Sequence, residues 1–137
     1  MQSTIGNGIR YSAAVGYLDQ KSRQRPNLDI LVNTYATRVL PTSSSRFLDI
    51  RTIELVPRQK PGVVGKRITV TASKELILSA GAIGSPQILL NSGIGDKKEL
   101  EAAGVKTILN LPDVGKNLTD HMTVPLSWSA TGPVPPA

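Results

Sequence analysis

The residues with the clearest chemical meaning stand at a corner between two apolar segments. Ser79, Ala80 and Gly81 follow the apolar run 76–78 and precede a segment with a helical pattern. Small side chains at the end of a strand allow a backbone or a ligand to approach closely. In open α/β sheets, ligands bind beyond the carboxyl ends of the strands. The spacing therefore predicts a ligand-binding corner, although an ordinary strand-to-helix turn in a core has the same pattern.

The corner needs a strand before it and a helix after it. The run 76–78 (Leu-Ile-Leu) predicts a short buried strand. Ser85 is placed to cap a helix, with Pro86 at the first helical position, where a missing N–H costs nothing. Gly93 is expected to end that helix with a positive φ. A strand, a corner of small residues and a capped helix form a common α/β unit.

Residues 81–95 (GAIGSPQILLNSGIG) carry a more specific signal. Without a gap, they resemble the second signature of the glucose-methanol-choline (GMC) oxidoreductases, which are FAD-dependent alcohol oxidases and dehydrogenases. The residues of this segment are most similar to those of the aryl-alcohol oxidase branch. Residues 115–121 (GKNLTDH) resemble a second family motif. In those enzymes, the chain runs past the flavin near this motif.

The resemblance implies where FAD would lie. In flavoproteins with two dinucleotide-binding domains, a similar apolar strand ends in a triplet of small residues beside FAD, and Ser79, Ala80 and Gly81 match that triplet. The family residue that binds the adenine of FAD through its backbone corresponds to Ala36. From the residues alone, simple packing of Ala36 in a strand is an equally good interpretation.

Composition restricts the other classes. The chain has 137 residues, 39% of them hydrophobic, which suits one small domain. The lack of cysteine excludes disulfides and thiolate chemistry. No apolar run approaches the roughly 20 residues that span a bilayer, so no membrane partner is expected, and no signal segment opens the chain. The net charge of +6 would suit a nucleic-acid surface, but the basic residues neither cluster densely nor interleave with aromatics. A solvated basic face is therefore favoured over a nucleic-acid partner.

The remaining elements follow from periodicity and turn residues. The pattern predicts a helix over 11–18 capped by Ser12, a charged loop over 21–26, a buried strand at 30–32 that continues over 35–40, and strands over 47–56 and 67–72, the last forming a hairpin with 76–78. Asp96 and Glu99 resemble a capping box, which predicts a helix that buries Leu100 and Ala103 and ends at Gly104.

The only histidine, His121, is a weak candidate for a general base, because a base needs matched geometry and environment. A structural or flavin-side role is favoured, and one histidine cannot make a metal site. Nothing in the chain matches the GxGxxG loop that places the FAD diphosphate at a helix N-terminus. The C-terminal His-His or His-Asn base pair of the family is not matched either. The chain is therefore expected to be an internal fragment of a longer enzyme.

The resemblance completes the prediction. The fold is α/β, a partial FAD/NAD(P)-binding (Rossmann-like) domain with a mixed sheet, incomplete as given. Residues 1–125 are expected to be the middle part of the FAD-binding domain, and 126–137 the start of the substrate-binding region. The parent would transfer hydride from a small-molecule primary alcohol to FAD, and would be secreted, as aryl-alcohol oxidases typically are. The alternative is a truncated, non-catalytic product. The alcohol, oxidase versus dehydrogenase activity and oligomeric state stay open.

Overall fold

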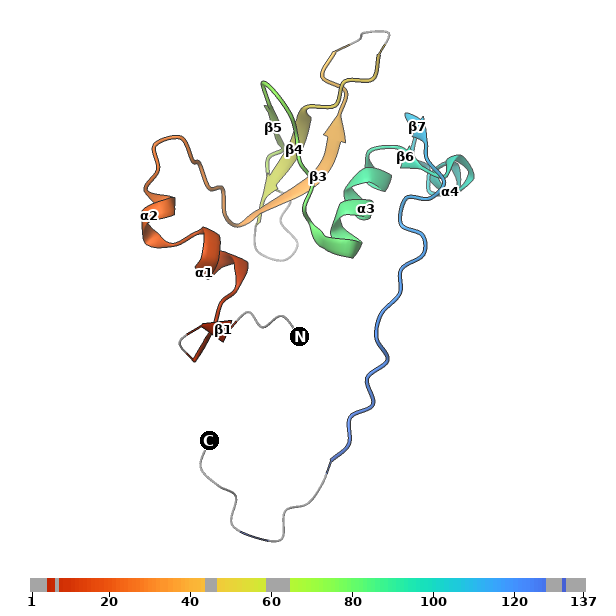
Figure 1. The fold of residues 1–137 in the computed structure, drawn as a ribbon. Coiled ribbons are helices and arrows are strands. Elements are labelled where there is room, and N and C mark those ends of the chain that lie inside the picture. The colour runs from red at the N-terminus through yellow and green to blue at the C-terminus, as the bar shows by residue number, and fades with distance from the viewer. Residues whose placement is uncertain (1–4, 7, 44–46, 59–64, 128–131, 133–137) are drawn as a thin grey trace.

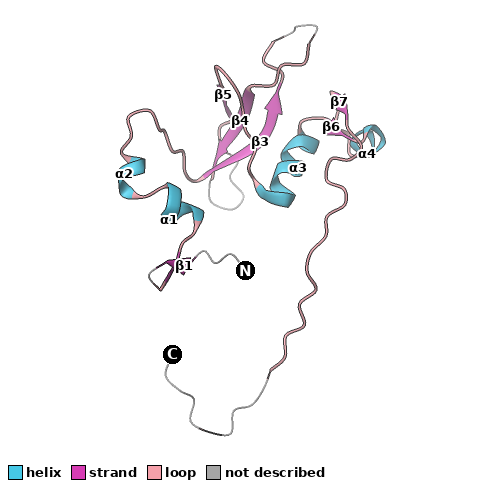
Figure 2. Cartoon of the chain, viewed as in Figure 1, coloured by secondary structure: helices cyan, strands magenta, loops and turns pink. Residues whose placement is uncertain are grey.

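The computed structural model describes residues 5–6, 8–43, 47–58, 65–127 and 132. Short helices and strands are interspersed along this part of the chain (Figures 1 and 2). In chain order they are β1 (Ile5–Gly6), β2 (Ile9–Arg10), α1 (Ala13–Tyr17), α2 (Gln20–Arg23), β3 (Thr34–Leu40), β4 (Thr52–Pro57), β5 (Ile68–Thr71), α3 (Gly81–Asn91), β6 (Ile94–Gly95), α4 (Lys97–Ala102) and β7 (Leu109–Asn110). This composition confirms the predicted α/β class.

The described strands form three small sheets rather than one. β1 and β2 are an antiparallel pair, β3, β4 and β5 form an antiparallel sheet in that order, and β6 pairs with β7 in parallel. Both kinds of pairing are therefore present, as a mixed architecture requires, but they occur in separate sheets of the described residues. β5 pairs with β4 and not with residues 76–78, so the predicted hairpin between 67–72 and 76–78 is wrong.

The core lies where α3 meets the outer edge of β3 (Figure 1). Val39, Ile88 and Ile94 form a buried cluster. Six partly buried hydrophobic residues pack against this cluster: Ala36, Ile50, Ile53, Leu76, Leu78 and Leu89. The backbone N–H of Val39 donates to the Ser92 hydroxyl at 2.8 Å, so a side chain of the helix end satisfies a backbone donor of the strand edge.

The predicted start of the central helix at Ser85 and Pro86 is wrong. α3 begins at Gly81, and Pro86 is its sixth residue. The Ser85 hydroxyl instead accepts from the backbone N–H of Ala80 at 3.0 Å, which ties the first turn together from inside the helix. Proline at the sixth position removes one helical N–H, a loss that the packing of the helix on β3 can offset. The end of the helix is as predicted, because Gly93 has φ +81°.

Two predicted strands are not formed among the described residues. Residues 76–78 alternate as a strand would, with Leu76 and Leu78 half-buried and Ile77 71% exposed, but they pair with no described strand. Residues 30–32 are exposed coil ahead of β3. A strand is defined by its hydrogen-bonded partner, and apolar content alone cannot supply one.

The short helices follow their caps. Ser12 caps α1 as predicted. α2 occupies the predicted charged loop, because the Asp19 carboxylate accepts from the N–H of Ser22 at 2.8 Å and starts a helical turn. The Asp96 carboxylate caps α4 and Leu100 is buried, both as predicted, whereas Ala103 is exposed. Within the described ranges, no helix is long and apolar enough to cross a bilayer.

Candidate functional site

The corner between residue 78 and α3 is open. Ser79, Ala80 and Gly81 are exposed, and Gly81 has φ +86°. The position that a Cβ would take at Gly81 has no neighbouring atom within 4 Å beyond adjacent residues and its own helix backbone. Ala80 provides no side-chain hydrogen bond to the helix N-terminus. Within the described residues, the N-terminus of this 11-residue helix thus has no side-chain cap.

Ala36 lies on β3, near the other side of the same core. It is half-buried, and its methyl group packs against the cluster that also receives Leu76 and Leu78. The chain that enters the corner and the strand that carries Ala36 thus share one set of core contacts. The pairing of β3 with β4 shifts between Ala36 and Arg38, so Thr37 is the extra residue of a β-bulge.

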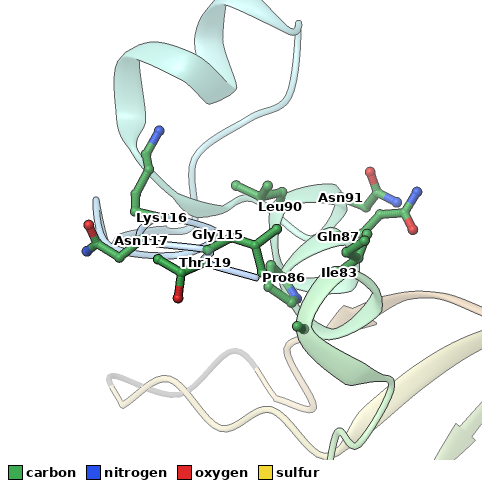
Figure 3. Close-up of a pocket in the computed structure, with 11 residues that line it drawn as sticks. Ile83, Pro86, Gln87, Leu90, Asn91, Gly115, Lys116, Asn117 and Thr119 are labelled. Carbon is green, nitrogen blue, oxygen red and sulfur yellow. The ribbon is translucent and has the colours of Figure 1, made fainter. Parts of the chain in front are cut away.

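A cleft of about 700 Å³ lies between α3 and residues 115–119 (Figure 3). Ala82, Ile83, Pro86, Gln87, Leu90 and Asn91 line one wall, and Gly115, Lys116, Asn117, Leu118 and Thr119 line the other. Gly115 lies close to the helix, since a Cβ there would be 3.5 Å from that of Pro86. The cleft begins directly beyond Gly81, so the two motifs that carry the family resemblance face each other across it.

A buried carboxylate contacts the residues that follow Ala36 on β3. Glu54 is 5% exposed, and its carboxylate accepts from the Thr37 hydroxyl at 2.7 Å, from Arg38 at 3.0 Å and from Arg67 at 2.5 Å. The hydrogen bond from Thr37, followed by those from the two arginines, lowers the pKa of Glu54 from 4.5 to about 2, although burial acts in the opposite direction. Glu54 is therefore an anion at every physiological pH.

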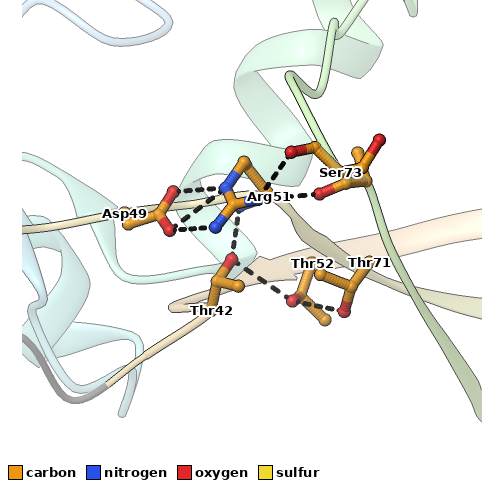
Figure 4. Close-up of polar contacts among 7 residues, drawn as sticks. Thr42, Asp49, Arg51, Thr52, Thr71 and Ser73 are labelled. Carbon is orange, nitrogen blue, oxygen red and sulfur yellow. Dashed lines mark hydrogen bonds and ion pairs between the residues drawn. The ribbon is translucent and has the colours of Figure 1, made fainter.

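A second polar network fixes the chain that leads into the corner (Figure 4). Arg51 forms a forked ion pair with Asp49 at 2.7 Å and donates to the carbonyl oxygens of Ala72 and Ser73 at 3.1 and 3.0 Å. The hydrogen bond from the Arg51 side chain lowers the pKa of Asp49. The network anchors residues 72–73, a few residues before the corner, to the loop ahead of β4.

His121 has no base-like geometry in the described part of the chain. It is exposed on the extended segment after residue 117, and its backbone N–H donates to the Asp120 carboxylate at 2.8 Å. The described residues also contain no group of three or more metal-ligating side chains. The described residues thus offer an open corner and a cleft, and no acid–base centre is formed among them.

Comparison with known proteins assigns the chain to a family. The family profile described as GMC oxidoreductase matches residues 1–123. The chain belongs to the GMC oxidoreductase family. The resemblance predicted from residues 81–95 and 115–121 is therefore confirmed.

Three relatives define the extent of the match. The chain is 43% identical over 128 residues to dehydrogenase eriK of Hericium erinaceus, and 44% identical over 134 residues to pyranose dehydrogenase 2 of Leucoagaricus meleagris. It is 40% identical over 140 residues to glucose dehydrogenase [FAD, quinone] of Drosophila melanogaster. The matches cover 93–96% of this chain but only 20–21% of each relative. The chain thus spans about a fifth of the length of the curated relatives it matches.

A solved structure supports the fold and the cofactor. The chain superposes on an FAD-dependent oxidoreductase from Chaetomium thermophilum with a TM-score of 0.60 and 31% sequence identity, over 75% of this chain and 16% of that one. FAD is the cofactor of this GMC chain, as predicted. The names of the GMC relatives specify pyranose and glucose, so activity on aryl alcohols stays a prediction.

The sequence did not indicate the two buried polar residues that hold β3 against α3 and β4. Ser92 and Glu54 are the buried polar residues of the described chain, and neither was singled out. Glu54 carries no signal of burial, because an acidic residue between Ile53 and Leu55 fits the alternating pattern of a strand with one polar face. Ser92 carries none, because a serine before a helix-ending glycine is common and its partner Val39 is 53 residues away.

Proposed function

We propose that this chain supplies the adenine contact and a surface beside the diphosphate in the FAD site of a GMC oxidoreductase, whose GxGxxG loop, not matched in this chain, would hold the diphosphate itself. The observation that carries the proposal is the open corner, where Ser79, Ala80 and Gly81 leave space at the start of a helix. A helix N-terminus with free N–H groups favours an anion such as a diphosphate. Bulky side chains in these three positions would occupy the space instead.

Ala36 has a different role in this proposal. Its side chain packs inward on the core, so only its backbone is available to a ligand. A backbone N–H and C=O match the acceptor and donor on the edge of adenine. A contact of this kind places no demand on the side chain, and alanine is suitable because it fills little of the space beside the core.

The whole protein is proposed to oxidise a primary alcohol, as an aryl-alcohol oxidase does. Bound FAD would supply the hydride acceptor, and the protein would orient the isoalloxazine ring and supply a base. The cleft between α3 and residues 115–119 provides a wall along which the cofactor continues from the corner. Its apolar side chains, such as Ile83 and Leu90, would keep water from that part of the cofactor. His121 is not assigned as the base, because its side chain lies exposed on the extended segment after residue 117.

The domain assignment and location belong to the same proposal. Residues 1–125 are taken as the middle part of the FAD-binding domain and 126–137 as the start of the substrate-binding region, most of which lies outside the described residues. The protein is proposed to be secreted. The purified chain 1–137 alone is expected to produce no alcohol-dependent peroxide, since its described residues hold no acid–base centre.

The corner is tested with two matched glycine substitutions in the holoenzyme that contains this chain. Gly81 and Gly104 both have positive φ and open space at the Cβ position, and asparagine tolerates this backbone conformation. Gly81→Asn is expected to weaken FAD binding by about tenfold or more, a typical effect of inserting atoms into an occupied site. Gly104→Asn, at the end of α4, is expected to leave FAD binding within about twofold. Equal FAD affinity of the two variants would refute the proposed corner.

Substrate class needs a separate assay. The holoenzyme is supplied with benzylic primary alcohols and, in parallel, with glucose, and flavin reduction is followed anaerobically. Faster reduction by the benzylic alcohols is expected, and faster reduction by glucose would place the protein with the sugar dehydrogenases. Peroxide release under air then distinguishes an oxidase from a dehydrogenase.

A further inference from the structure

Glu54 is the one charged side chain buried in the described part of the chain, and the proposed FAD contacts make no use of it. A buried carboxylate is costly unless several donors satisfy it. Here three donors converge on it from outside its own strand: Thr37 and Arg38 on β3, and Arg67 just before β5. Glu54 therefore joins the three strands of the central sheet at one point.

That point is the β-bulge next to Ala36. Ala36 pairs with Leu55 and Arg38 pairs with Glu54, so Thr37 has no partner of its own in the ladder. The Thr37 hydroxyl is 2.7 Å from the Glu54 carboxylate and 3.2 Å from the Glu54 carbonyl oxygen, and it donates to both. A bulge bends its strand and re-aims the groups beside it. The Thr37 hydroxyl and Glu54 thus lock the bend that immediately follows Ala36.

The opposite side of the bulge is also held. The carbonyl oxygen of Thr37 accepts from the Asn91 side chain of α3 at 3.4 Å, and two residues later the Val39 N–H donates to Ser92. The edge of β3 is therefore closed by α3 from Thr37 onward. Ala36 is the last residue before this closed part.

We infer that Glu54 and Thr37 are positioning residues for the adenine end of FAD. The carboxylate holds the bulge, and the bulge aims the backbone N–H and C=O of Ala36 at the adenine edge. This inference rests on the proposed function, because it requires that Ala36 contacts adenine. It adds that the contact depends on two side chains that do not touch the cofactor.

The test combines side-chain variants with a modified cofactor. The full enzyme that contains this chain is stripped of its flavin and titrated with FAD or with 1,N6-etheno-FAD. In the etheno derivative, a bridge blocks N1 and N6 of adenine. Thr37→Val keeps the β-branched shape and removes the hydroxyl, and Thr37→Ser keeps the hydroxyl. Glu54→Gln keeps the size and removes the charge. The dissociation constant of each pair is read from flavin fluorescence.

The unmodified protein is expected to bind FAD about tenfold more tightly than the etheno derivative, the usual size of one or two lost hydrogen bonds. In Thr37→Val, FAD binding is expected to weaken by about tenfold and etheno-FAD binding by less than about twofold. The reason is that the bridged adenine cannot form the hydrogen bonds with the backbone of Ala36, so it has none to lose. Thr37→Ser is expected to restore the discrimination. Glu54→Gln is expected to behave as Thr37→Val does.

Two results would overturn the inference, and they have different meanings. If Thr37→Val weakens both cofactors equally, the bulge only stabilises the sheet, and the Ala36 contact itself still stands. If the unmodified protein fails to discriminate between the two cofactors, Ala36 does not read the adenine edge, and that part of the proposed function fails with the inference. Thr37→Val tests the positioning role of the bulge even if Glu54→Gln does not fold.

Discussion

The Ser92 hydroxyl joins the end of α3 to the edge of β3, and its removal should loosen one identifiable amide. Ser92 is buried; its Oγ accepts from the Val39 N–H at 2.8 Å and donates to the Ile88 carbonyl oxygen at 2.5 Å. The substitution Ser92→Ala deletes both hydrogen bonds and adds no bulk. The two hydrogen bonds do not contribute equally to stability, because only one of the two backbone groups loses its last hydrogen-bond partner.

The magnitude follows from those partners. The Ile88 carbonyl oxygen keeps the N–H of Ser92 at 3.1 Å, so its loss is small. The Val39 N–H belongs to a residue that is 2% exposed, and neither water nor another acceptor can replace the hydroxyl. A buried donor left without a partner costs about 1–3 kcal/mol. We take about 2 kcal/mol, which corresponds to about 30-fold in an equilibrium constant.

Amide hydrogen exchange in the holoenzyme measures this cost directly. The Val39 amide is expected to exchange about 30-fold faster in Ser92→Ala, provided that it exchanges by local opening. Ser85→Ala is the matched control, because it also removes a hydroxyl that accepts a backbone N–H, that of Ala80 at 3.0 Å. That site is exposed, so water can take over, and exchange at Val39 should stay unchanged. An increase below about threefold in Ser92→Ala would refute the assigned role of the hydroxyl.

Two further predictions concern stability. The pKa of Glu54 in the folded protein is about 2, below its ordinary 4.5, so its stabilising contribution is complete above pH 4.5 and is lost as the pH falls toward 2. Its arginine partners are about half-exposed, which limits the contribution to about 1–2 kcal/mol, and the stability difference between the unmodified protein and Glu54→Gln should vanish across that window in urea titrations. Gly93→Ala should destabilise the protein by about 3 kcal/mol or more, because a Cβ there would overlap the Lys106 carbonyl oxygen, whereas Gly104→Ala should cost only about 1 kcal/mol of backbone strain. Equal unfolding midpoints of the two alanine variants would contradict the close contact at Gly93.

The features that sequence predicted best depend on neighbours in the chain. Gly93 ends α3 with a positive φ and Asp96 caps α4, because capping involves groups within three or four residues. The helix start was mispredicted for a related reason. Pro86 favours a first helical position, but the packing of α3 on β3 and the Ser85 hydroxyl extend the helix back to Gly81.

The features that sequence could not predict depend on distant partners. Residues 76–78 have the composition of a buried strand, yet no described strand lies beside them to form a ladder. The site shows the same division. The corner was predicted from its small residues and Ala36 from a family resemblance, whereas the bulge at Thr37 depends on register with β4, and no local pattern encodes register at that point.

The signature segment therefore combines two unrelated requirements for small residues. At Gly93 and Gly95, a side chain would collide with protein atoms, the carbonyl oxygen of Lys106 in one case and the Leu90 side chain in the other. At Gly81, a side chain would meet open space. Gly104 has the same positive φ and the same open space, so these two features alone do not require a ligand at Gly81. The proposed FAD site distinguishes these positions: a substitution at Gly93 should destabilise the fold, and Gly81→Asn should weaken FAD binding in a protein that is still folded, whereas Gly104→Asn should leave FAD binding unchanged.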